Sequence, residues 1–166
     1  SQLLGSLLLS KVKNAELTAV GELYTVNGIY RAYGKELTIE HGKLQYAGNL
    51  LTNPGLNILA VKKVSVVGSS NGISNADDAT QSTQSRTVTA GIKVSGTLKM
   101  PMVTLYSQPS GLSQTDILSY IIFDAPRSQI SSLSALTLLN DVAMGQGSGG
   151  NHLHDMTDKI QNTLGL

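Results

Sequence analysis

Residues 29–48 read IYRAYGKELTIEHGKLQYAG, and apolar and polar side chains alternate along most of this stretch. Leu37 and Ile39 share one parity, whereas Leu44 and Tyr46 share the other. Because successive side chains of a strand point to opposite faces, each half places its apolar residues on a single face. The stretch therefore predicts antiparallel sheet with one apolar face and one polar face.

The change of parity falls at His41 and Gly42, and two structures explain it. A two-residue turn would join two strands and place Ile39 beside Leu44. A glycine bulge would instead add one residue within a single long strand. Both keep the apolar face continuous, so the sequence leaves the two alternatives open.

The period of two extends from this stretch to about residue 107. Its clearest instance is AGIKVSGTL, in which the apolar residues of positions 90–98 interleave with Gly91, Lys93, Ser95 and Thr97. Residues 69–89 interrupt the pattern, because they are polar and nearly free of large apolar side chains. They predict a mobile polar loop between strands.

Beyond residue 107 the period changes to 3.6, which predicts a helical segment over residues 108–166. Ser113 and Asp116 have the spacing of a capping box, so a first helix is expected to begin there and to end before Pro126. Two further apolar stripes predict helices over residues 129–144 and 153–164. The sheet is therefore expected to be followed by two or three short amphipathic helices.

Composition excludes several functions. Twelve basic and eleven acidic residues give a formal charge of +1, which argues against a nucleic-acid partner. The chain has no cysteine, so disulfides and thiol chemistry are absent. It also has seventeen glycines, one phenylalanine and no tryptophan, so we expect an interior that is thin or open.

The apparent chemical motifs do not predict an enzyme. GQGSGG at residues 145–150 matches a dinucleotide fingerprint, but a helix precedes it where the mechanism needs a strand, so it is interpreted as a linker. His152 and His154 would point to different faces of a helix and chelate a metal poorly. We therefore expect no catalytic residue, no metal and no cofactor.

Two further groups of polar side chains have a simple interpretation. Lys62 and Lys63 are predicted to be the solvated end of a strand, with contact to lipid headgroups as the alternative. The six tyrosines are predicted to be half-buried strand residues with solvated hydroxyls, rather than a belt around a ligand.

The start of the chain, SQLLGSLLLSK, is too short to span a bilayer and lacks a basic leader. It also begins without methionine. We expect the chain to be a piece of a longer protein, with any signal or membrane anchor outside it.

Three stretches carry a resemblance to a known family. GIYRAYGKELTIEHGKLQYAG from Gly28, NPGLNILA from Asn53 and GIKVSGTLKMPMVTLYSQPSGLSQTDILSYIIF from Gly91 resemble the C-terminal domain of the TamB family of AsmA-like proteins. The resemblance implies a half-pipe, or β-taco, over residues 1–107, with an apolar concave face. It also implies a periplasmic location, in a parent protein that is anchored in the inner membrane and reaches the outer membrane.

Two activities follow from the resemblance. Family members are expected to move phospholipid between the two membranes and to support assembly of outer-membrane proteins such as autotransporters, together with a TamA-like barrel protein. An apolar trough could hold acyl chains, because each buried methylene contributes about 0.8 kcal/mol. The residues predicted to line it are Leu37, Ile39, Leu44, Tyr46, Leu56, Ile58, Ile92, Val94, Leu98, Val103 and Leu105.

Two other roles remain open at this stage. A chaperone-like module could add client strands of outer-membrane proteins to a free sheet edge through backbone hydrogen bonds. A structural spacer would instead have its apolar face closed by the helices as an ordinary core.

Overall fold

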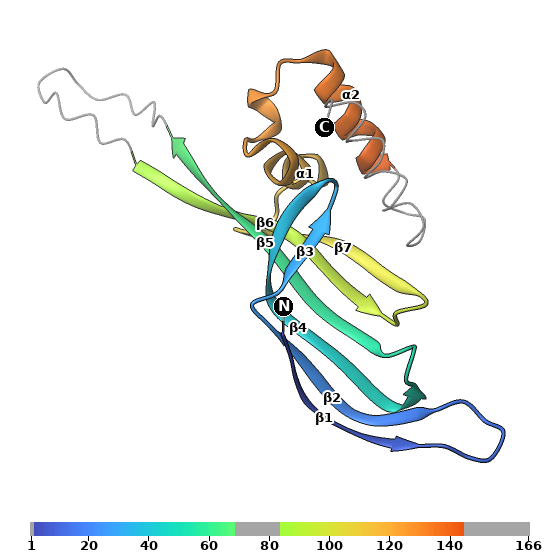
Figure 1. Ribbon diagram of the computed structural model, residues 1–166. Helices are drawn as coiled ribbons and strands as arrows, with labels where there is room; N and C mark the ends of the chain where they lie inside the picture. Colours follow the sequence, from blue (N-terminus) through green and yellow to red (C-terminus); the bar gives the residue numbers. More distant parts are fainter. Residues whose placement is uncertain (1, 69–83, 145–166) are drawn as a thin grey trace, which may run out of the picture.

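The computed structural model of the chain describes residues 2–68 and 84–144. It is an open, curved sheet with helices at one end (Figure 1). The elements are, in chain order, β1 (Gln2–Ser10), β2 (Thr18–Val26), β3 (Ile29–Ala32), β4 (Lys35–Leu50), β5 (Gly55–Gly68), β6 (Gln84–Gly96), β7 (Pro101–Gln108), α1 (Gln114–Phe123), the 3₁₀ turn η1 (Arg127–Gln129) and α2 (Leu133–Met144).

The seven strands form one antiparallel sheet in the order β1-β2-β4-β5-β6-β7, with the short β3 paired to β4. The sheet does not close on itself, so within the described residues β1 and β7 are its edges. The predicted fold class, a mainly β protein with a curved antiparallel sheet and C-terminal helices, is confirmed. The predicted linker 145–150 and the third helix, 153–164, lie outside the described residues.

The parity change in β4 comes from a bulge. Ile39 pairs with Ala60 and His41 with Leu59, so Glu40 is an extra residue on β4. The strand continues without a turn over sixteen residues. The two-residue turn is therefore wrong and the bulge is confirmed, although the added residue is Glu40 rather than a glycine.

The predicted loop 69–89 is too long at its C-terminal end. Residues 84–89 belong to β6 and pair with the end of β5, where Val64 faces Val88. Val88 is buried, although polar residues surround it in the sequence. The polar composition of residues 84–89 does not predict a strand. They form one all the same, because strands pair through backbone hydrogen bonds, which do not depend on side-chain polarity. Residues 69–83 lie outside the described part of the chain.

Helix α1 begins as its sequence predicts. The Asp116 backbone amide donates to Ser113 Oγ at 3.1 Å, which satisfies one of the free N–H groups of the first turn. The helix ends at Asp124, which adopts φ 58° and donates its backbone N–H to the Tyr120 carbonyl. The second helix starts at Leu133, four residues later than predicted, because residues 127–129 form a separate 3₁₀ turn.

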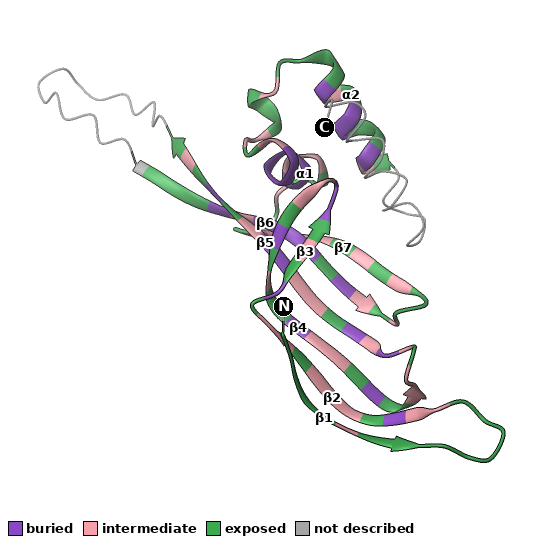
Figure 2. Cartoon of the chain, in the orientation of Figure 1, coloured by how far each residue is buried: buried purple, intermediate pink, exposed green. Residues whose placement is uncertain are grey.

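The core forms where the two helices meet the sheet. Helix α1 packs across β6 and β7, and α2 packs on α1. The buried residues of this end lie in the helices and in the middle of β5 and β6 (Figure 2). Leu118 and Ile121 of α1 have no exposed surface, and neither does Ile92 of β6.

Lys62 of β5 links α1 to the sheet through an ion pair and a hydrogen bond. Its ammonium group lies 2.6 Å from Asp124 Oδ1 and donates to the Ile121 carbonyl oxygen at 3.4 Å. A cation at the C-terminal end of a helix is favourable because the helix dipole places negative charge there. The prediction that Lys62 is a solvated strand end is wrong, since it lies within β5 and its side chain is only one-quarter exposed.

The bulge predicts which deletions in β4 the fold tolerates. Removing Glu40 leaves a regular ladder and keeps every apolar side chain on its face. Removing Lys43 instead turns Leu44 and Tyr46 to the opposite face. We expect urea unfolding to show a cooperative transition after the Glu40 deletion and a loss of about 3 kcal/mol or more after the Lys43 deletion. Equal losses from both deletions would contradict the assigned bulge.

Candidate functional site: the apolar face of the sheet

The face of the sheet that carries α1, called the inner face below, is apolar across all the main strands. Antiparallel pairing aligns its side chains in rows that cross the sheet. The rows are Leu23, Leu44 and Leu56; Ile58, Val94 and Val103; and Ile39, Ala60, Ile92 and Leu105. Residues that are distant in sequence therefore form one surface, as the alternation predicts.

The helices cover only part of this surface. Under α1, Ala60, Ala90 and Ile92 are completely buried. Of the residues predicted to line the trough, four belong to this buried core and five pack beside it half-buried. The four are Leu37, Leu56, Ile92 and Val94, and the five are Ile39, Leu44, Ile58, Val103 and Leu105.

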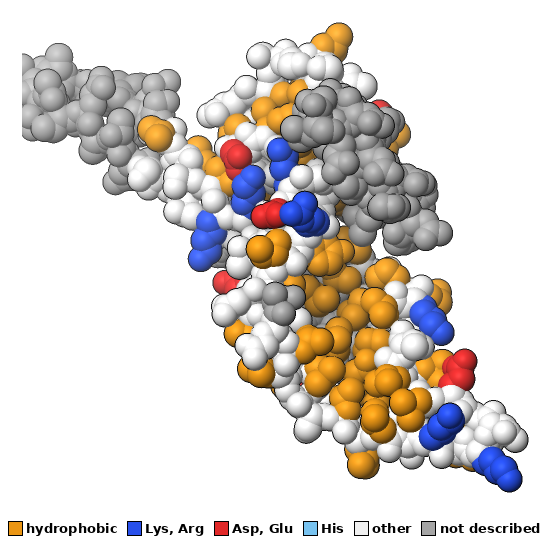
Figure 3. All heavy atoms as spheres, in the orientation of Figure 1, with side chains coloured by type: hydrophobic (Ala, Val, Ile, Leu, Met, Phe, Trp, Pro, Cys, Tyr) orange, Lys and Arg blue, Asp and Glu red, His pale blue; other side chains and the backbone are white. Residues whose placement is uncertain are grey.

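Beyond α1 and α2, no element among the residues that the structure describes covers the inner face. Leu23, Leu44 and Ile58 are half-buried, and Leu3 and Leu9 at the β1 edge are 54% and 52% exposed. Figure 3 shows apolar side chains as one continuous patch that runs from the helical end down over the strands. The covered core and the open patch are thus two parts of the same surface.

The other two residues predicted to line the trough are Leu98, which is exposed, and Tyr46, which is buried. Leu98 lies in the turn between β6 and β7 and is 57% exposed, so it does not line the inner face. Its strand ends at Gly96, which adopts a positive φ of 77° and turns the chain. Tyr46 is buried, and its hydroxyl donates to the Leu51 carbonyl oxygen at 2.9 Å.

The sequence prediction missed the contribution of β1 to the inner face. Leu3, Leu7 and Leu9 lie on this face through their pairing with β2. Leu4 and Leu8 occupy the other parity, so the strand shows no alternation and its inner residues could not be distinguished. The length of the apolar run, typical of a strand, was the available signal.

Two glycines of the site have no room for a side chain, Gly91 because of neighbouring backbone and Gly42 because of neighbouring side chains. A Cβ atom on Gly91 would overlap the Ala60 carbonyl oxygen of the neighbouring strand. One on Gly42, beside the bulge, would overlap Thr25 Oγ1. That hydroxyl is buried and makes no hydrogen bond within the described residues. The inner face therefore contains a single unsatisfied buried side-chain oxygen, among the residues the structure describes.

The opposite face of β2 and β4 is polar and charged. Glu22 pairs with Lys43 at 2.8 Å and accepts a hydrogen bond from the Tyr24 hydroxyl at 2.5 Å. These contacts lower the pKa of Glu22, and the hydrogen bonds with Glu22 raise the pKa of both Lys43 and Tyr24. These charged side chains thus lie on the opposite face, beside the exposed Val20 and Tyr24.

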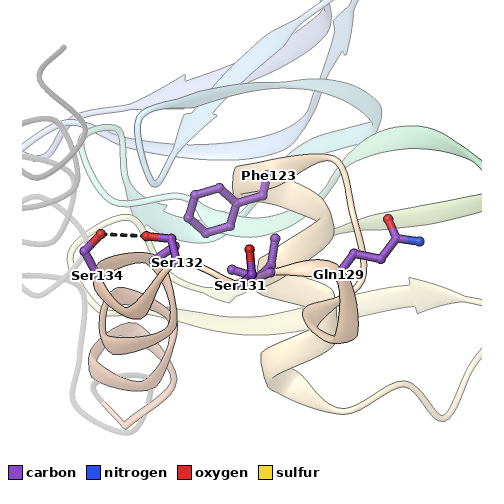
Figure 4. A pocket seen from close by; sticks show the side chains of 7 residues that line it. Phe123, Gln129, Ser131, Ser132 and Ser134 are labelled. Atoms are coloured by element: carbon purple, nitrogen blue, oxygen red, sulfur yellow. Dashed lines mark hydrogen bonds between the residues drawn. The ribbon is translucent and has the colours of Figure 1, made fainter.

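A hollow of about 330 Å³ lies between η1 and α2 (Figure 4). Its wall consists of apolar and small polar side chains, with a hydrogen bond of 2.9 Å between Ser132 and Ser134. None of its lining residues carries a charge. The described residues also contain no group of three or more His, Cys, Asp or Glu side chains that could hold a metal ion.

The fold and the site define an open β-sheet domain with an apolar face that helices cover at one end. The profile of the TamB C-terminal domain matches residues 1–166, and the chain belongs to this family. It is 29% identical over 119 residues to the translocation and assembly module subunit TamB of Haemophilus influenzae. The matched part is 72% of this chain and 8% of that protein.

No helix in residues 2–68 and 84–144 is long and apolar enough to cross a membrane.

The division of the inner face predicts unequal costs of truncation. Ile92→Ala should lower the free energy of unfolding by about 2 to 4 kcal/mol, because it leaves a cavity beneath α1. Leu44→Ala should cost about 1 kcal/mol, because that side chain is already partly exposed. Urea titration of both variants measures the difference. Similar losses would mean that the open part is packed like a core.

Proposed function

We propose that the open part of the inner face binds the acyl chains of phospholipids. The observation that carries this proposal is the continuity of the half-buried residues Leu23, Leu44 and Ile58, which lie in two neighbouring rows, with the core beneath α1. A contiguous apolar patch on the surface of a protein is typical of an interaction site. A chain of about twelve buried methylenes would gain about 10 kcal/mol before its ordering cost is subtracted.

We further propose that the chain serves a larger protein that moves phospholipid between the inner and outer membranes. The chain would then be a periplasmic segment, and its partners would include a TamA-like outer-membrane barrel. Support comes from membership in the TamB family and from the name of the Haemophilus influenzae relative, which places that protein in a translocation and assembly module. The same membership supports a role in the assembly of outer-membrane proteins.

The proposed role is binding without catalysis. Burial of an acyl chain is driven by the apolar area removed from water, so it needs no nucleophile, acid or metal. The half-buried side chains of the open rows are aliphatic, which is the chemistry that hydrocarbon requires.

A second candidate function is the addition of client strands to the sheet. It is favoured by the free edge of β7, which pairs only with β6 among the described residues. Backbone hydrogen bonds at an edge would accept strands of many sequences. A strand peptide from an outer-membrane barrel should then bind equally well when the inner face carries a charge.

Charge substitutions on the inner face test the lipid proposal. We expect Ile58→Asp and Leu44→Asp to abolish co-purification of phospholipid, measured by mass spectrometry of solvent extracts. The physical reason is that a carboxylate beside the acyl chains must be desolvated. Asn57→Asp is the matched control, because Asn57 is the exposed neighbour of Ile58 on the opposite face.

Thermal unfolding should show that all three variants fold. Val94→Arg is unsuitable for this test, since Val94 is buried in the core and the arginine would unfold that end. Equal lipid content in Ile58→Asp and Asn57→Asp would contradict binding at the inner face, and lipid-free wild-type protein would contradict the proposal altogether.

A further inference from the structure

Three turns lie in a row along one end of the sheet, and backbone hydrogen bonds join them (Figure 1). They are residues 11–17, 51–54 and 97–100, which connect β1 to β2, β4 to β5 and β6 to β7. The Leu51 amide donates to the Leu17 carbonyl oxygen at 2.9 Å, and the Leu98 amide donates to the Pro54 carbonyl oxygen at 3.0 Å. We call these three turns the turn row.

A side chain also joins the second turn to the third, because the Lys99 amide donates to Asn53 Oδ1 at 2.9 Å. The three turns are therefore held at fixed positions relative to one another. The tips of the three turns therefore lie at the same end of the sheet.

The outer two turns have the same unusual composition. In the first, Val12 is 74% exposed and lies between Lys11 and Lys13. In the third, Lys99 lies between Leu98 and Met100, which are 57% and 78% exposed.

All three lysines are exposed, and Glu16 is the one acidic residue in these turns. The turn row thus carries a net positive charge beside three exposed apolar tips. A turn that only reverses the chain in water needs neither, since small polar residues serve that purpose.

We propose that the turn row docks the domain onto an anionic membrane surface. Lysines near such a surface are attracted to lipid phosphates, while apolar tips enter the boundary between headgroups and acyl chains. The alternation of lysine and apolar side chains along each tip matches these two layers. A nucleic acid would attract the lysines but would leave the apolar tips in water.

Docking in this way would bring the inner face to the membrane. Tyr46, on the inner face, donates its hydroxyl to Leu51 of the turn row, so the apolar surface reaches this end of the sheet. The inference does not rest on the proposed lipid binding, because docking needs only the tips.

Sedimentation with vesicles tests the inference on the 166-residue chain. The vesicles are of phosphatidylcholine, with or without phosphatidylglycerol. The wild type should bind the anionic vesicles and release them as salt is added. A variant with Lys11→Gln, Lys13→Gln and Lys99→Gln should bind about a hundredfold more weakly, at about fivefold per lysine. A variant with Val12→Ser, Leu98→Ser and Met100→Ser should bind at least about tenfold more weakly.

The matched control removes three exposed cations elsewhere, through Lys63→Gln, Lys93→Gln and Arg86→Gln, and should bind like the wild type. Equal weakening in this control would overturn the inference, because attraction would then follow net charge alone. Absence of vesicle binding by the wild type would overturn it too and would favour a protein partner. Ile58→Asp should bind vesicles normally, so failure of lipid co-purification and failure of docking are distinguishable.

Discussion

The inner face of the sheet is larger than the area that α1 and α2 can cover, and the structure depends on this difference. Helix α1 has ten residues and is about 15 Å long. The six strands of the main order span about 24 Å, and the sixteen residues of β4 extend for about 50 Å. Within the described residues, α1 and α2 therefore cannot cover the whole inner face, although its alternation makes nearly all of it apolar. The part beneath α1 becomes the core, and the described residues leave the rest without a covering layer.

The covered part is secured by interactions that do not depend on apolar area. Ser113 caps the start of α1, and Lys62 forms an ion pair with Asp124 at its end. The Lys62 contacts join the C-terminal end of α1 to β5, whereas the Ser113 cap stabilises the helix itself.

Much of this could be predicted from the sequence. Alternation identified the strands and placed Ile39, Ile58 and Ile92 on one face, and the spacing of Ser113 and Asp116 located α1. Other features depend on contacts between distant residues and could not be read from one segment. Val88 belongs to a strand only because β5 pairs with it, and Lys62 is held by a helix that lies far along the chain. Leu98 has the same parity as the inner-face residues Ile92 and Val94. It does not lie on that face, because β6 ends at Gly96.

In the proposed lipid binding, hydrocarbon occupies the open part of the inner face and not the part beneath α1. Nuclear magnetic resonance with a phospholipid spin-labelled on its acyl chain tests it most directly. We expect strong broadening of the methyl signals of Leu23 and Leu44, with little effect on Ile92 or on Leu59 of the opposite face. Broadening that is equal on the two faces, or absent at Leu23 and Leu44, would contradict it.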